Sequence, residues 1–188
     1  MPLTVANKIT IARILAVPFF VITMLYYSPD RDYLRYVALG IYLFAVASDI
    51  LDGYLARSRG EKTDIGALLD PFADKILLVS SFICLYVVGN QFPVMNFSFW
   101  LVMGVISRDI LLLAGSLVLF VLYRRLDIPV SGWGKAAMFL QSACVVGLLL
   151  QWSSTSALWY VALFFTVVSA FDYAIKGLQI FIEKGSLR

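Results

Sequence analysis

Apolar residues follow one another along this chain in long runs, and polar residues gather in the short stretches between them. A helix that spans a bilayer needs about 20 consecutive, mainly apolar residues. Six runs come close to this length or exceed it, at residues 9–27, 34–55, 67–88, 99–123, 133–151 and 157–182. The pattern predicts an all-α integral membrane protein with six transmembrane helices, in which residues 1–188 form a single membrane domain.

The composition agrees with this prediction. Of the 188 residues, 61% are hydrophobic and only 14% are charged, whereas soluble domains carry about 25% charged residues. The chain has no histidine, which excludes a histidine-ligated metal site and a histidine general base. Cys84 and Cys144 lie inside apolar runs, so we expect them to be packing residues rather than a disulfide or a zinc site.

Lysine and arginine are distributed unevenly around the predicted helices. On one side only Arg31 and Arg35 are basic. The other side would hold the two termini and the second and fourth loops, with Lys8, Arg13, Arg57, Arg59, Lys62, Arg124, Arg125, Lys135, Lys176, Lys184 and Arg188. Because basic loops stay in the cytoplasm, the asymmetry predicts that both termini are cytoplasmic.

Four carboxylates stand at the ends of the second and third predicted helices. Asp49 and Asp52 are three residues apart, and Asp70 and Asp74 are four apart, so each pair shares one helix face. Two helices joined by a short loop lie antiparallel, and their acidic faces can meet. One charge inside a bilayer costs at least about 2.5 kcal/mol, so something must compensate four.

Divalent cations are the compensation that best suits this donor set. Mg²⁺ and Mn²⁺ prefer oxygen ligands, and pairs of such ions recur in phosphoryl chemistry. A salt-bridge network with Arg57 and Lys75 is an alternative, but two cations cannot neutralise four acids. A cation path through a transporter is another, although it would not favour an arginine at position 57.

The acidic segment resembles the signature of the CDP-alcohol phosphatidyltransferase family, D-x2-D-G-x2-A-R-x8-G-x3-D-x3-D, at every specified position between Asp49 and Asp74. The resemblance implies that Asp49, Asp52 and Asp70 hold two divalent ions, Mg²⁺ or Mn²⁺, with Asp74 near the second ion and serving as the general base. It also implies a pocket for cytidine diphosphate, lined by Asp52, Gly53, Ala56, Arg57, Gly66 and Thr10.

The acceptor side of the reaction is marked by other basic residues. Asn7, Thr10 and Arg13 resemble the N-x2-T-x2-R opening of the branch that uses glycerol phosphate, although Asn7 and Thr10 could instead cap the first helix. Arg108 lies inside the fourth apolar run, and an ionisable residue there is a functional candidate. We expect Arg108, Lys135 and Arg13 to bind the phosphate of the acceptor. A structural pair of Arg108 with Asp109 or Asp172 is the alternative.

The sequence is compatible with two acceptors. The opening, the segment from Asp70 to Lys75 and the Gly134-Lys135 pair resemble phosphatidylglycerophosphate synthases. The chain departs from that branch at Ser107-Arg108-Asp109, where Ala-Arg-Glu is usual, at Gly115-Ser116, where a second arginine is expected, and at Ala137-Met138, where Lys-Thr usually follows. The resemblance favours glycerol 3-phosphate, with phosphatidylglycerol, the acceptor of CDP-alcohol-type cardiolipin synthases, as the second choice.

The resemblance also implies the surroundings of the protein. Its partners would be CDP-diacylglycerol, a glycerol-phosphate-type acceptor, the lipid bilayer and a second copy in a homodimer, with no nucleic acid. The protein would sit in a bacterial-type cytoplasmic membrane with its active site facing the cytoplasm.

Overall fold

The computed structural model describes residues 5–59, 64–92, 99–123 and 132–185. Within these ranges the protein is helical and contains no strand. The six long helices are α1 (Val5–Leu25), α2 (Tyr33–Arg59), α3 (Asp64–Val88), α4 (Phe99–Tyr123), α5 (Gly132–Leu149) and α6 (Thr155–Gly185), and two short 3-10 helices, η1 (Pro29–Arg31) and η2 (Gly89–Gln91), follow α1 and α3. The predicted all-α class and its six helices are confirmed.

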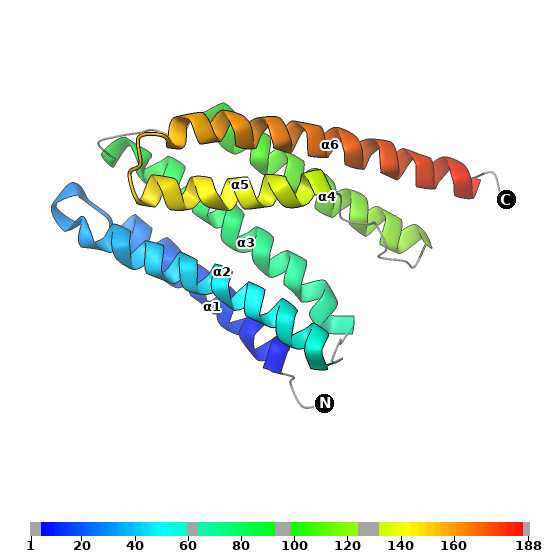
Figure 1. The fold of residues 1–188 in the computed structure, drawn as a ribbon, viewed down its shortest axis with the longest axis horizontal. Helices are drawn as coiled ribbons and strands as arrows, with labels where there is room; N and C mark the ends of the chain where they lie inside the picture. Colours follow the sequence, from blue (N-terminus) through cyan, green and yellow to red (C-terminus); the bar gives the residue numbers. More distant parts are fainter. Residues whose placement is uncertain (1–4, 60–63, 93–98, 124–131, 186–188) are drawn as a thin grey trace. The chain divides into compact units, whose positions relative to one another are not determined.

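The chain forms two compact units, and the first consists of Met1–Phe97 together with Val145–Ser153. In this unit α1 packs against both α2 and α3 (Figure 1). Phe20 and Met24 on α1 are fully buried, as are Ala38 and Ala45 on α2. The two alanines are small and let α1 and α2 approach each other closely. The acidic motif lies on α2 and α3, and both helices belong to this first unit.

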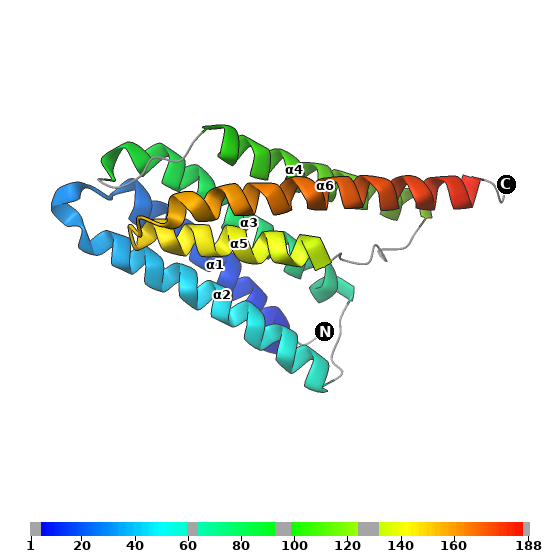
Figure 2. The same cartoon turned by 45° about the horizontal axis from the view of Figure 1, so that its top comes forward.

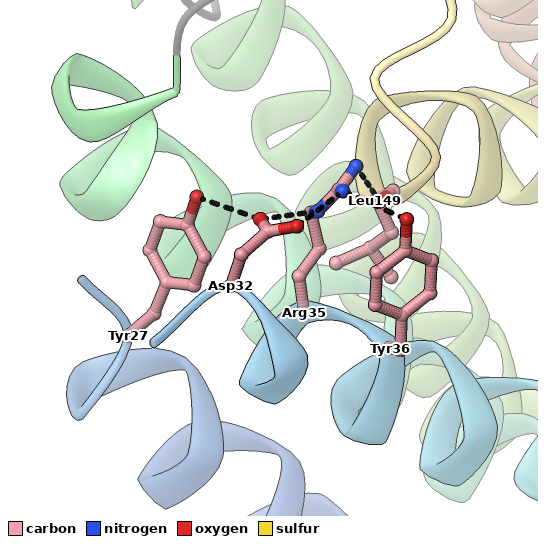
Figure 3. A network of polar contacts seen from close by, with 5 residues as sticks. All are labelled: Tyr27, Asp32, Arg35, Tyr36 and Leu149. Carbon is pink, nitrogen blue, oxygen red and sulfur yellow. Dashed lines mark hydrogen bonds and ion pairs between the residues drawn. The ribbon is translucent and has the colours of Figure 1, made fainter. Parts of the chain in front are cut away.

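A buried arginine joins the start of α2 to the end of α5 within the first unit (Figure 3). The Nε and Nη2 atoms of Arg35 donate to the two carboxylate oxygens of Asp32, at 2.9 and 2.8 Å, and Nη1 donates to the carbonyl oxygen of Leu149 at 3.0 Å. Tyr36 and Tyr27 complete this network, through hydroxyl contacts to Arg35 at 3.1 Å and to Asp32 at 3.4 Å. The arrangement satisfies a carbonyl at a helix end, where intrahelical donors are missing.

The end of α5 itself has the geometry of a Schellman motif. The amide of Trp152 donates to the carbonyl of Gly147 at 2.9 Å, and the amide of Gln151 donates to that of Leu148 at 2.8 Å. Gln151 has a φ of 53°, the left-handed conformation that this type of helix end requires. Arg35 and this turn together fix the end of α5 within the first unit.

The second unit comprises Ser98–Cys144 and Ser154–Arg188, and in it α4 packs against α6 (Figure 2). Its buried side chains include apolar residues such as Val105 and Ala162. They also include Gln141, which donates to the hydroxyl of Thr166 at 2.9 Å. Thr166 in turn donates to the carbonyl of Ala162, at 2.6 Å. Polar groups thus lie inside this unit.

The outer faces of the helices are strongly apolar. On α6 the side chains of Phe164, Val167, Phe171 and Ile175 are between 46 and 67% exposed, and their spacing places them on one face. On α1 Leu15, Phe19 and Ile22 form a similar exposed face. An apolar exterior around buried polar groups is unusual for a soluble protein, whose exposed apolar patches are small.

Helix length and composition agree with this view for part of the chain. Among the described residues, Gly132–Leu149 and Thr155–Lys176 are long and apolar enough to cross a membrane. Shorter apolar stretches are Ile11–Leu25, Tyr33–Ser48 and Lys75–Gln91. Cys84 and Cys144 are free and buried, as predicted. That all six helices span, that both termini are cytoplasmic and that residues 1–188 are one domain stay predictions.

Candidate active site

The acidic motif lies on two consecutive helices of the first unit. Asp49, Asp52, Gly53, Ala56 and Arg57 belong to the last turns of α2, and Gly66, Asp70 and Asp74 belong to the first turns of α3. Four residues link Arg59 to Asp64, so the Cα atoms of these two helix ends lie at most about 18 Å apart. The two groups of acids therefore lie at neighbouring helix ends, as the sequence predicted.

The side chains of these eight motif residues, and that of Thr10, lie outside the part of the chain that the structure describes. Their assignment as metal-binding, CDP-binding or catalytic residues therefore stays a prediction. Among the side chains that are described, no group of three or more aspartate, glutamate or cysteine residues could hold a metal ion.

Arg13 is placed on α1, the helix that packs against both motif-bearing helices. Its side chain is only 1% exposed and has an interaction partner. A buried guanidinium is stable only when its charge is paired or hydrogen-bonded. Arg13 lies in the first unit with the acidic motif, whereas Arg108 and Lys135 lie in the second.

Arg108 is the centre of a buried polar cluster in the second unit. It is 5% exposed. Its Nη1 atom donates to Oδ1 of Asp109 at 2.6 Å, and its Nη2 atom donates to the hydroxyl of Ser169 on α6, also at 2.6 Å. The pair with Asp109, one of the two structural alternatives, is therefore present. Asp172 pairs with Lys176, at 2.8 Å.

The first turn of α5 lies against the same part of α6. A Cβ atom added to Gly134 would lie 3.2 Å from Cε2 of Tyr173 and 3.4 Å from the hydroxyl of Ser169. The distance to Ser169 is an ordinary contact, whereas the shorter one would require Tyr173 to shift by a few tenths of an ångström. Lys135, the next residue, is exposed. Lys135 thus follows directly after Gly134, the residue of α5 that lies close to Ser169, and Ser169 is the hydrogen-bond partner of Arg108.

Sequence reasoning missed Ser169, Thr166 and Tyr173. These residues recur at intervals of three and four along α6, which places them on one face of the helix. The hydroxyls of Thr166 and Ser169 on this face are buried, whereas the apolar face of α6 described above is exposed. A stripe of hydroxyl groups inside an apolar run is a signal that could have singled them out.

Comparison with known proteins identifies the family. The model of the CDP-alcohol phosphatidyltransferase family matches residues 3–168. A CDP-diacylglycerol–glycerol-3-phosphate 3-phosphatidyltransferase of Haemophilus influenzae is 34% identical over 187 residues, or 95% of this chain and 92% of the relative. A protein with the same description from Yersinia pestis is 30% identical over 181 residues, covering 92% of this chain and 94% of the relative.

A probable phosphatidylglycerophosphate synthase of Mycobacterium tuberculosis is 30% identical over 179 residues, which is 93% of this chain and 81% of the relative. The match to the family model includes the whole acidic motif on α2 and α3 and extends into α6. The chain belongs to the CDP-alcohol phosphatidyltransferase family.

Proposed function

We propose that this protein transfers a phosphatidyl group from CDP-diacylglycerol to glycerol 3-phosphate, releasing CMP and forming phosphatidylglycerophosphate. The observation that carries the proposal is the similarity, over more than nine-tenths of the chain, to relatives described by this activity. The family signature is complete between Asp49 and Asp74. A cation transporter has no use for its fixed glycine, alanine and arginine positions.

The residues of the motif fit a pair of divalent ions. Asp49 and Asp52 near the end of α2, with Asp70 and Asp74 near the start of α3, form an all-oxygen donor set, which Mg²⁺ and Mn²⁺ prefer. When bound, two such ions would supply charge neutralisation of the diphosphate and of the departing CMP. Arg57 on the same helix is suited to the diphosphate oxygens because its planar guanidinium binds them in pairs.

The reaction is a displacement at the phosphorus atom that carries diacylglycerol. The hydroxyl oxygen of the acceptor forms a new bond to this phosphorus, and the bond from phosphorus to the bridging oxygen of the diphosphate breaks. That oxygen leaves with CMP and keeps the electron pair. The hydroxyl proton passes to a carboxylate, for which Asp74 is our candidate. Asp74 must therefore be ionised and close to the hydroxyl when the acceptor binds.

The basic residues of the acceptor site follow from the same proposal. Arg108 and Lys135 are our candidates to bind the phosphate of glycerol 3-phosphate, and the contribution of Arg13 stays a prediction from the sequence. Of these, Arg108 is held within a buried cluster and Lys135 is exposed, next in sequence to Gly134. The planar guanidinium of an arginine can bind two phosphate oxygens at once, and the ammonium group of a lysine adds a compact positive charge.

The membrane setting is supported by the apolar exterior of α1 and α6. Helix α2 has 27 residues and is therefore about 40 Å long, more than the ~30 Å hydrocarbon core. The end of α2 that carries the motif can therefore reach the cytoplasmic surface, where CMP would be released into water.

A labelling experiment tests this topology. We expect single cysteines at Ser186 and Ser28, in a background without Cys84 and Cys144, to be labelled from opposite sides of the membrane. Labelling from one side would refute the topology.

A homodimer is the further expectation from the family. Light scattering of the purified protein in detergent, corrected for the bound detergent, should give twice the mass of the 21.0 kDa chain. A mass of one chain would refute this part of the proposal without affecting the activity.

The activity is tested by CMP release from CDP-diacylglycerol in detergent, with Mg²⁺ and either glycerol 3-phosphate or phosphatidylglycerol. We expect turnover with glycerol 3-phosphate, and Asp70→Asn should lower kcat by about 100-fold or more. Asp30→Asn, an exposed acid on η1, is the matched control and should keep full activity. Turnover with phosphatidylglycerol alone would replace the proposed acceptor, and CMP release that survives Asp70→Asn would refute the metal site.

A further inference from the structure

We propose that Ser169 is a positioning residue, which holds the guanidinium of Arg108 in the orientation that binds the phosphate of the acceptor. This inference rests on the proposed function and extends it to a residue outside the family signature. It follows from the contacts of Arg108, from the helices that meet at Ser169 and from the other buried hydroxyl groups of the chain.

The donors of Arg108 are only partly used by its neighbours. A guanidinium is planar and has five N–H groups in a fixed arrangement. Asp109 accepts from Nη1 and Ser169 accepts from Nη2, so contacts on two different nitrogens fix the plane. The Nε atom is buried and has no hydrogen-bond partner in the part of the chain that the structure describes. Asp109 and Ser169 therefore leave donors of Arg108 unused, and the proposal assigns such donors to the phosphate of the acceptor.

The two contacts of Arg108 differ in what they can position. Asp109 follows Arg108 on the same helix, so the bond between these two residues does not by itself join α4 to another helix. Ser169 lies 61 residues further along the chain, on α6. Its hydroxyl also lies against Gly134, in the first turn of α5. Ser169 is thus the point at which Arg108 is aligned with both α5 and α6.

Two other buried hydroxyls, among those that the structure describes, donate within their own helices. Those of Ser81 and Thr166 donate to the carbonyl four residues earlier in their own helices, at 2.7 and 2.6 Å, which is the usual arrangement for such residues in a helix. Ser169 instead accepts from a charged group on another helix. Charge-assisted hydrogen bonds are shorter and stronger than neutral ones. A packing role alone would not require this bond.

The test is the kinetic constants of Ser169→Ala. Since the bond orients a phosphate ligand, we expect the KM for glycerol 3-phosphate to rise by about 10- to 100-fold. The KM for CDP-diacylglycerol should stay within about twofold, because Ser169 and Arg108 are not among the predicted CDP-binding residues. Inorganic phosphate, used as an inhibitor competitive with the acceptor, should lose affinity by a similar factor. Ser169→Thr keeps a hydroxyl at the same position and should recover most of the affinity.

Thr166→Ala is the matched control. Thr166 is on the same face of α6, is 2% exposed and bonds to Ala162 and Gln141, so its loss removes a buried hydroxyl of the same unit. We expect unchanged KM values for both substrates. The inference is overturned if Ser169→Ala leaves the KM for glycerol 3-phosphate unchanged, or if Thr166→Ala raises it equally.

Binding measurements keep this inference separate from the proposed function. Calorimetric titration of glycerol 3-phosphate into the wild-type protein and Ser169→Ala requires no turnover, and should show the same loss of about 10- to 100-fold. If the wild-type protein turns over but the two proteins bind equally, only the role of Ser169 fails. If the wild-type protein neither binds nor uses glycerol 3-phosphate, both the proposed acceptor and the role of Ser169 fail.

Discussion

Replacement of Arg35 by methionine removes the network shown in Figure 3 while keeping a long, flexible side chain at that position. Arg35 is 6% exposed and connects the turn before α2 to the end of α5. Because it bonds two segments that are far apart in the sequence, we expect Arg35→Met to lower the stability of the first unit.

The magnitude can be worked out contact by contact. The charge-assisted bond to the carbonyl of Leu149 is worth about 1.5–3 kcal/mol. The ion pair with Asp32 contributes less, about 0.5–1 kcal/mol, since that carboxylate is 45% exposed and water can replace its partner. The cation–π contact with Tyr36, 4.6 Å from the ring centre, adds about 0.5–1 kcal/mol. Methionine avoids the cost of burying a charge, which leaves a net loss of about 2–4 kcal/mol.

Thermal unfolding in detergent measures this loss. For a chain of this size, a loss of about 2–4 kcal/mol corresponds to a fall in Tm of roughly 5–15 °C. Arg31→Met, an exposed position on η1, is the matched control and should change stability by less than about 0.5 kcal/mol. Substrate KM values should not change below the Tm, because Asp52 is about 25 Å further along α2.

Two outcomes would refute this reasoning. If Arg35→Met has the same Tm as the wild-type protein, neither the network nor its bond to Leu149 contributes to the free energy of unfolding. If the variant keeps its Tm but loses activity, Arg35 acts on the reaction, and the distance argument along α2 is wrong.

Three further predictions concern single positions. The hydrogen bonds from Arg35 hold the pKa of Asp32 below its usual value of 3.8. Ionised Asp32 therefore stabilises the fold above pH 3.8, and this contribution disappears as the pH falls through the lowered pKa. The difference in Tm between the wild-type protein and Asp32→Asn should be constant at neutral pH and vanish in acid. Gly134→Ala should be less stable than Gly132→Ala, because its new Cβ would lie 3.2 Å from Tyr173 and the ring must shift by a few tenths of an ångström, whereas nothing lies within 4 Å of a Cβ at position 132; equal melting of the two variants would contradict the close contact. Gln141→Met removes a buried carbonyl oxygen that has no hydrogen-bond partner among the described residues, but it also removes the hydrogen bond to Thr166. The two effects oppose each other, so we expect stability to change by at most about 1 kcal/mol; a larger fall in Tm would show that the bond to Thr166 outweighs the unpartnered oxygen.

The helices could be predicted closely because they depend on local properties. The predicted third and fourth helices end at Val88 and Tyr123, as the structure has them. The second was predicted to end at Leu55, but α2 continues to Arg59, and α1 begins at Val5 rather than Ile9. A run of apolar residues marks only the part of a helix that avoids water, whereas the backbone hydrogen bonds continue into polar turns.

The candidate site was predictable only in part. The spacing of the acids placed Asp49 and Asp52 on one helix and Asp70 and Asp74 on the next, which the backbone confirms. For Arg108 the sequence left the partner open between Asp109 and Asp172, and the structure shows Asp109. Ser169 could not be found as a partner, since nothing in the spacing of one helix indicates which residue of another will face it.

The sequence by itself determined the helical class, the position of the acidic motif and membership of the family. These properties lie in short stretches of chain, where apolar length and residue spacing decide the outcome. Only the tertiary structure decided that Arg35 binds the carbonyl of Leu149, 114 residues away, and that Arg108 binds Ser169, 61 residues away. A buried charge takes its partner from whichever helix packs against its own, and packing is settled by the shapes of whole helix faces.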